Sequence, residues 1–95
     1  MSDVITGAVA ALNAKIGSSY DGLAKFVIKD EGAIMLDGAG ARAGDEEADV
    51  TMTATREVFE AILAGEMNPT MAFMTGKLKV DGSMGQAMKL GAALA

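Results

Sequence analysis

The segment ADVTMTA, residues 48–54, alternates apolar and polar side chains, and this period of two restricts the fold more than any other feature of the sequence. Val50, Met52 and Ala54 fall on one side of the chain, and Asp49 falls on the other with the intervening threonines. The pattern is typical of a strand with one buried face and one face in water. Because such a strand must bury its apolar face against another layer, the fold must contain a covered sheet.

Four other segments have the composition of strands. The period of two recurs in residues 23–29, which lead into a hairpin, and in the return segment AIMLDG, where Ile34 and Leu36 share a face. We predict that these two strands and residues 48–54 run antiparallel to one another. The other predicted strands are KLKVDG, residues 77–82, and a short edge strand around Arg42 in the loop GAGARAGDEE.

Apolar residues at helical spacing, together with residues that favour helix ends, predict four helices. Ser2, Thr55, Asn68 and Ser83 are N-cap residue types, and Gln86 stands three positions after Ser83, as in a capping box. The order of helices and strands predicts a mixed sheet with helices covering one face. The predicted helices are residues 3–16, 56–64, 69–75 and 84–95.

The length of 95 residues and the net charge of −5 restrict the number of domains and the partners. A chain of this length forms one domain, so we predict a single domain over residues 1–95. The acidic balance lacks the basic surface that nucleic acids require, and we expect no nucleic-acid partner. The charge is uneven, however, with −7 in residues 1–70 and +2 in residues 71–95. The C-terminal quarter is therefore locally basic.

The sequence also bears on the location of the protein. Its N-terminal residues have neither the basic start nor the compact apolar block of a secretory signal. No apolar run approaches the ~20 residues of a membrane-spanning helix. We therefore expect a cytoplasmic protein that does not insert stably into membranes.

The sequence contains neither cysteine nor histidine, which leaves few groups for catalysis or metal binding. Thiol nucleophiles, the commonest general base and the usual zinc ligands are excluded. The acidic run at residues 45–49 lacks the ligand spacing of a calcium loop, and we interpret it as solvated. Asp49 with Lys77 or Tyr20 is the remaining acid–base combination. Without a nucleophile motif, we predict no enzyme activity, no metal and no cofactor.

Methionines concentrate in the last third of the chain. Met67, Met71 and Met74 precede the last predicted strand, and Met84 and Met88 follow it. Methionine side chains are flexible and adapt to irregular neighbours, so a cluster of them suits the wall of an apolar cavity that accepts a guest. The alternative interpretation is that these methionines fill gaps in an ordinary core.

Two lysines lie on the last predicted strand. Lys77 and Lys79 fall on one face of that strand, and Leu78 and Val80 fall on the other. Charged side chains commonly protect a solvated strand face or a sheet edge, and this is the first interpretation. Contact with a ligand head group or with an anionic surface is the alternative.

The second half of the chain resembles the sterol carrier protein type 2 family of lipid-binding domains. The similarity is carried by ADVTMTA, by the helix REVFEAILAG and by MNPTMAFMTGKLKVDGSMGQAMKL. An alternating strand with an Asp, a helix that ends in Gly, and a Pro- and Met-containing helix before GKLKV form a specific combination. The similarity covers about half of the chain, and the preceding hairpin fits the family loosely.

The resemblance implies an SCP-2-like fold, in which helices cover one face of a five-stranded mixed, mainly antiparallel sheet. Its fold class is α/β, of the α+β type. It also implies a hydrophobic cavity that binds and transfers fatty acids, fatty acyl thioesters or sterols without catalysis. Lys77 and Lys79 are the candidates for contact with a lipid head group. The side chains expected to contact the lipid are Met52, Phe59, Ile62, Met67, Met71, Met74, Leu78, Val80, Met84, Met88 and Leu90.

A second function remains open at the level of sequence. The last predicted helix is apolar beyond what one packed face needs, so it could bind a protein partner or form a homodimer without any lipid cavity. A dimer whose stability does not change when lipid is added would favour this alternative.

Overall fold

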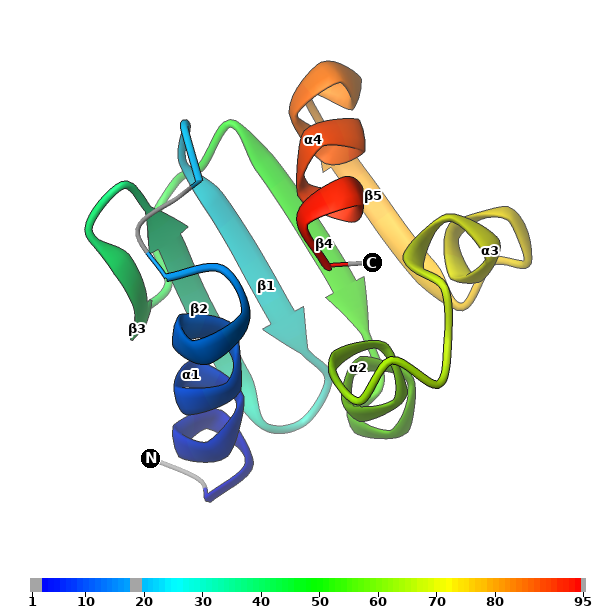
Figure 1. Ribbon diagram of the computed structural model, residues 1–95, viewed down its shortest axis with the longest axis horizontal. Helices are drawn as coiled ribbons and strands as arrows, with labels where there is room; N and C mark the ends of the chain where they lie inside the picture. The colour runs from blue at the N-terminus through cyan, green and yellow to red at the C-terminus, as the bar shows by residue number, and fades with distance from the viewer. Residues whose placement is uncertain (1–2, 18–19, 95) are drawn as a thin grey trace.

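The structure is a computed structural model that describes residues 3–17 and 20–94. Within these residues the chain forms one five-stranded sheet and four helices, and the helices lie over one face of the sheet and beside the last strand (Figure 1). The strands are β1 (Ala24–Ile28), β2 (Gly32–Asp37), β3 (Gly40–Ala43), β4 (Val50–Ala54) and β5 (Leu78–Gly82). The helices are α1 (Asp3–Lys15), α2 (Arg56–Leu63), α3 (Pro69–Met74) and α4 (Met84–Leu94).

The sheet is mixed, with the strand order β3-β2-β1-β4-β5. The pairs β1–β2, β2–β3 and β4–β5 are antiparallel, whereas β1 and β4 are parallel, with Phe26 opposite Met52. The prediction that the first long strands are all antiparallel is therefore wrong for β1 and β4. The loop after β3 returns across the open face and starts β4 beside the start of β1, where the Asp49 N–H donates to the Leu23 carbonyl at 3.0 Å. Alternation of side chains carries no information about strand direction.

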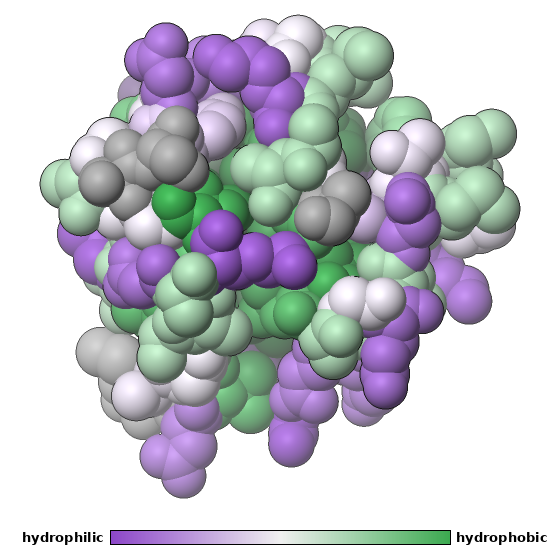
Figure 2. Space-filling view, in the orientation of Figure 1, coloured by the Kyte–Doolittle hydropathy of each residue, from purple (hydrophilic) through white to green (hydrophobic). Residues whose placement is uncertain are grey.

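The core lies between the sheet and the helices. Alternate side chains of β1 and β4 are buried on the helix side, as the period of two predicts. The rings of Phe26 on β1 and Phe59 on α2 pack edge to face, with their centroids 5.4 Å apart. Figure 2 shows strongly hydrophobic atoms seated between the helices in the middle of this face, with hydrophilic side chains around them.

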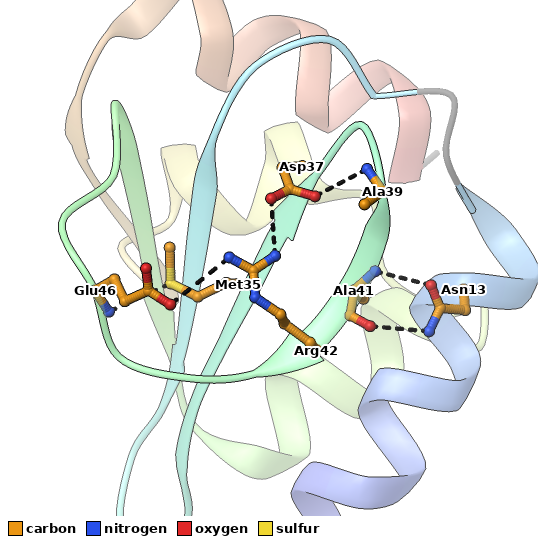
Figure 3. Close-up of polar contacts among 7 residues, drawn as sticks. All are labelled: Asn13, Met35, Asp37, Ala39, Ala41, Arg42 and Glu46. Carbon is orange, nitrogen blue, oxygen red and sulfur yellow. Dashed lines mark hydrogen bonds and ion pairs between the residues drawn. The ribbon is translucent and has the colours of Figure 1, made fainter.

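The sequence pattern of β2 does not predict that Met35 is buried, because Met35 points to the face of the sheet opposite the helices. Its side chain is nevertheless 0% exposed. The loop after β3 covers it, and the Glu46 N–H lies 3.5 Å from the Met35 sulfur (Figure 3). Arg42 links this loop to the end of β2, since its guanidinium lies 2.8 Å from the Asp37 carboxylate and 3.6 Å from the Glu46 carboxylate. The Arg42 hydrogen bond lowers the pKa of the Asp37 carboxyl.

The outer edge of the sheet at β3 is closed by a side chain of α1. The Ala41 N–H donates to Asn13 Oδ1 at 2.8 Å, and Asn13 Nδ2 donates to the Ala41 carbonyl at 3.1 Å (Figure 3). The amide of Asn13 thereby pairs both backbone groups of an edge residue, as a neighbouring strand would. This contact fixes α1 against the sheet at the edge that lies opposite β5.

The predicted helix starts at Thr55, Asn68 and Ser83 are confirmed. Their side-chain oxygens accept backbone N–H groups of Val58, Thr70 and Gln86 at 3.3, 2.8 and 3.2 Å. The second half of the predicted capping box is wrong, because the side chain of Gln86 bonds to other partners, described below. The cap predicted at Ser2 and the helix end predicted at residue 95 lie outside the described residues.

Candidate functional site

A groove of about 420 Å³ lies between α3 and α4, above the strands β4 and β5; we call it the α3–α4 groove. Its floor is formed by Met52 of β4 and by Leu78 and Val80 of β5, which the sheet register places side by side, with Met52 opposite Val80. The period of two puts all three side chains on the helix side of the sheet. The floor is therefore apolar along its length.

The walls of the α3–α4 groove come from two helices of different character. In α3, Asn68 caps the first turn and Pro69 occupies the first position, and the residues that pack closely are Pro69 and the small Ala72. The bulkier side chains of this six-residue helix are consequently directed outward and toward the groove. The wall residues are Pro69, Thr70, Phe73 and Met74 from α3, and Met84, Ala87, Met88, Gly91 and Ala92 from α4.

The rim of the α3–α4 groove is formed by methionines that are largely in solvent. Met74 is 73% exposed, Met88 is 74% exposed and Met84 is 49% exposed. Pale green side chains gather over α3 and over the start of α4 in Figure 2. Methionine side chains are flexible, so this rim can adapt its shape to a neighbouring group.

A hydrogen-bond network holds the N-terminal end of α4 in place. Tyr20 Oη donates to Gln86 Oε1 at 2.7 Å, and Gln86 Nε2 donates to Asp49 Oδ2 at 3.3 Å. The Ser83 N–H donates to the Asp49 carbonyl at 2.8 Å. Gly82 leads into α4 at a positive φ of 100°, and a Cβ there would overlap the same carbonyl. One wall of the groove is thus fixed to β4 and to the segment before β1.

The same network includes Tyr20, one of the residues considered for acid–base chemistry. Tyr20 is 5% exposed, and burial, together with the negative charges of Asp49 and Asp21, raises the pKa of its hydroxyl. Its proton is engaged with Gln86. Neither Tyr20 nor Asp49 lines the α3–α4 groove. The arrangement positions a helix and brings no acid–base pair to the groove.

A second groove, of about 440 Å³, lies between α1 and α2; we call it the α1–α2 groove. It reaches Ile28 at the end of β1 and is lined in part by Phe59. Charged side chains also line it, namely Asp3 and the pair Arg56–Glu60, in which Arg56 Nε lies 3.0 Å from Glu60 Oε1. This groove combines an apolar floor with a charged border.

The structure brings six of the predicted lipid contacts together in the α3–α4 groove. These are Met52, Met74, Leu78, Val80, Met84 and Met88. Phe59, Ile62 and Leu90 are core residues, exposed by 3%, 2% and 0%, and none of them lines this groove. Met67 is partly buried against the core, and Met71 is 57% exposed outside the lining.

The two lysines of the last strand lie away from the groove. Lys79 is paired with Thr53 in the register, on the face of the sheet opposite Leu78 and Val80, and Lys77 precedes β5. Neither residue lines the α3–α4 groove. Their predicted contact with a lipid head group stays a prediction.

Sequence reasoning missed six residues of the groove. Phe73 belongs to the methionine-rich segment, so its position there was the available signal. In α4, positions 84, 87, 88 and 91 follow the spacing of one helix face, which indicates that Ala87 and Gly91 share a face with the two methionines. The missed residues are Pro69, Thr70, Phe73, Ala87, Gly91 and Ala92.

Neither a metal-binding cluster nor a membrane-spanning helix occurs in the described part of the chain. Over residues 3–17 and 20–94, no group of three or more His, Cys, Asp or Glu side chains is arranged to hold a metal ion. None of the helices in these same ranges has the length and apolar character needed to cross a membrane.

A family of known proteins matches most of the chain. Residues 8–95 match the SCP-2 sterol transfer family. The chain belongs to this family. A curated relative, the hydroxysteroid dehydrogenase-like protein 2 of Xenopus laevis, is 40% identical over 88 residues, which cover 84% of this chain and 21% of the relative. The chain thus spans about a fifth of the length of this relative.

Solved SCP-2 structures share the fold. The solution structure of the sterol carrier protein domain 2 of Helicoverpa armigera has a TM-score of 0.74 and 28% identity, with 96% of this chain and 84% of that chain covered. The sterol carrier protein 2 of Aedes aegypti, in complex with the C16 fatty acid palmitate, has a TM-score of 0.78 and 21% identity, with 100% and 97% covered. The predicted five-stranded mixed sheet of the SCP-2 fold is confirmed.

Proposed function

We propose that residues 1–95 form one SCP-2 domain that binds an apolar lipid in the α3–α4 groove and transfers it without catalysing a reaction on it. Membership of the SCP-2 sterol transfer family supports lipid binding and transfer as the general function. The observation that carries the choice of groove is its lining, in which Thr70 is the one polar side chain among twelve residues from four elements. Such a surface favours an alkyl chain, because each Å² removed from water contributes about 25 cal/mol.

The ligand we propose is a fatty acid or a fatty acyl thioester. The volume of about 420 Å³ is near the lower end of the ~300–1,000 Å³ that small-molecule sites occupy, which favours a single chain over a bulkier guest such as a sterol. The sterol carrier protein 2 of Aedes aegypti was solved with a C16 fatty acid bound, which supports the same class of ligand. The exposed methionines of the rim suit chains of different lengths.

The proposal is tested by thermal unfolding of delipidated protein with a panel of fatty acids, acyl thioesters and sterols. A guest that binds only the folded state stabilises it by about 2.7 kcal/mol at 100 times its Kd, which raises the melting temperature of a domain of this size by about 10–20 °C. We expect a dose-dependent rise with fatty acids and acyl thioesters, and a smaller rise with sterols. A melting curve that no member of the panel moves would contradict the proposal.

A homodimer formed through α4 is the second candidate function. The specific observation in its favour is the exposure of Met84 and Met88, two large apolar side chains on one helix. Sedimentation of the protein with and without fatty acid distinguishes the two functions. A dimer that persists unchanged when lipid is present would favour the interaction module, and a monomer that binds lipid would favour the carrier. The cytoplasmic location stays a prediction from the sequence.

A further inference from the structure

The methionines of this protein include side chains at both extremes of exposure. Met35 of β2 and Met52 of β4 are exposed by only 0% and 3%, and the loop after β3 covers the Met35 sulfur. A second group belongs to α3 and α4, and its side chains are between 49% and 74% exposed. This exposed group is Met71, Met74, Met84 and Met88.

Methionine carries all the sulfur of this chain, because the sequence contains no cysteine. Hydrogen peroxide oxidises a methionine thioether to the sulfoxide. The sulfur lone pair attacks one peroxide oxygen, so an S–O bond forms and the O–O bond breaks. The sulfur loses two electrons, and the second oxygen leaves as hydroxide and takes the remaining proton to form water. The product side chain is polar, whereas the original side chain was apolar.

Three of the exposed methionines border the α3–α4 groove, where Thr70 is the one polar side chain of the lining. These three are Met74, Met84 and Met88, which form its rim. A sulfoxide on the rim places a hydrogen-bond acceptor against an alkyl chain, which has no donor to offer it. Burying a polar group without a hydrogen-bond partner costs free energy, so an oxidised rim binds an alkyl chain more weakly.

We propose that Met74, Met84 and Met88 are oxidation sites through which hydrogen peroxide lowers the affinity of the α3–α4 groove for an acyl chain. This regulation rests on the proposed function, whereas the order in which the methionines are oxidised depends on their exposure alone. A methionine sulfoxide reductase reverses the change. In that step two thiols supply two electrons and two protons and become a disulfide, and the sulfoxide oxygen leaves as water.

The burial of Met35 and Met52 separates this regulation from damage to the fold. A sulfoxide at either position would place a polar oxygen in a packed interior and destabilise the folded state. Peroxide reaches these two sulfurs only when the structure opens locally, so we expect their oxidation to be more than about tenfold slower than that of the rim. Exposed side chains contribute little to stability, so the rim is oxidised while the fold stays intact.

The experiment treats the delipidated whole chain with hydrogen peroxide and locates the sulfoxides by mass spectrometry of tryptic peptides. We expect Met74 and Met88, the most exposed methionines, to be oxidised first, and Met35 and Met52 to be oxidised last. Titration of the same samples with a fluorescent fatty acid measures the affinity. We expect it to fall by about tenfold or more when the rim is oxidised, since an unpaired polar group is then buried against the chain. Treatment with a methionine sulfoxide reductase and a dithiol should restore it.

The variant Met74→Leu/Met84→Leu/Met88→Leu removes the sulfur from the rim and keeps its side chains apolar and of similar volume. Whatever its initial affinity for the fatty acid, peroxide should change that affinity by less than about twofold, because no rim sulfur remains to be oxidised. Met71→Leu is the matched control, since Met71 is exposed on α3 but does not line the groove. Peroxide should lower its affinity by the same factor as in wild type.

Three results would overturn the proposal and leave lipid binding itself standing. The first is an oxidised rim with unchanged fatty-acid affinity, and the second is an equal loss of affinity in Met74→Leu/Met84→Leu/Met88→Leu. The third is unfolding of the oxidised wild-type protein, detected by urea unfolding, to an extent that accounts for the lost affinity. Reduced wild-type protein that binds no fatty acid would instead refute the proposed function, and this regulation with it, before any peroxide is added.

Discussion

The two grooves of this protein are nearly equal in volume and different in chemistry. The α1–α2 groove has about 440 Å³ and the α3–α4 groove about 420 Å³. The first is bordered by Asp3 and by the ion pair of Arg56 with Glu60. The second has Thr70 as its single polar side chain among the lining residues. Volume alone therefore does not distinguish the two grooves, and our proposal of the α3–α4 groove rests on the polarity of its border.

The difference follows from how each groove is built. The α1–α2 groove lies between two helices whose exposed faces carry the charges that keep a helix soluble. The α3–α4 groove is bordered by a six-residue helix and by a helix rich in Ala, Gly and Met, so its border has few polar positions. An alkyl chain in the first groove must displace water from charged groups, which costs free energy. In the second it displaces water from apolar surface, which is favourable.

The largest expected effect is on the free energy of unfolding, and it distinguishes a core residue of α4 from a residue on the rim of the α3–α4 groove. Leu90 and Met88 are two residues apart on α4, but Leu90 is 0% exposed and Met88 is 74% exposed. We expect Leu90→Ala to lower the free energy of unfolding by about 2–5 kcal/mol, because it leaves a cavity. Met88→Ala should change it by less than about 0.5 kcal/mol. Urea unfolding measures both, and equal losses would place Met88 in the core.

The next prediction fills each groove in turn. Gly91 on α4 lines one groove and Gly7 on α1 lines the other, and a Cβ on either residue meets no atom within 4 Å. Gly91→Leu should block about four methylene groups of a bound chain, which corresponds to about 3 kcal/mol or roughly a 100-fold loss of fatty-acid affinity. Gly7→Leu should leave the affinity unchanged. Titration with a fluorescent fatty acid measures both affinities. A loss in Gly7→Leu with none in Gly91→Leu would assign the lipid to the α1–α2 groove.

A smaller effect concerns the network that holds the α4 wall. Tyr20→Phe removes the hydrogen bond to Gln86 and should lower the free energy of unfolding by about 1 kcal/mol near neutral pH. Because burial raises the pKa of Tyr20 in the folded state, the contribution of this group is complete below the ordinary value of 10.0 and decreases as the pH rises above it. The variant should lose less stability than wild type in this alkaline range. Parallel curves of stability against pH would contradict this interpretation of the network.

The smallest effect is expected at the charged border of the α1–α2 groove. Arg56→Gln breaks an exposed ion pair with Glu60 and should leave the free energy of unfolding almost unchanged. Fatty-acid affinity should also stay unchanged, because Arg56 does not line the α3–α4 groove. Binding of a fatty acid and of its methyl ester is compared in this variant. A loss confined to the free acid would show that Arg56 holds the carboxylate.

Local chemistry made much of the fold predictable. The alternation in β1 and β4 assigned their buried faces correctly, since a period of two places every second side chain on one side. The helix starts after Thr55 and Asn68 followed from side chains that accept free N–H groups of the first turn. The methionine cluster lies in the region of the α3–α4 groove, with Met74, Met84 and Met88 on its border, and its contact with a lipid stays a prediction.

The sequence alone determined the elements, their buried faces and the apolar character of the C-terminal third, because these depend on neighbours within a few positions along the chain. The tertiary structure decided the parallel pairing of β1 with β4 and the burial of Met35 beneath a loop. It also decided that Leu90 belongs to the core and Met88 to the rim, although both lie on one apolar helix. Exposure at these positions depends on which segments distant in sequence pack over them, and a pattern along one chain carries no record of that packing.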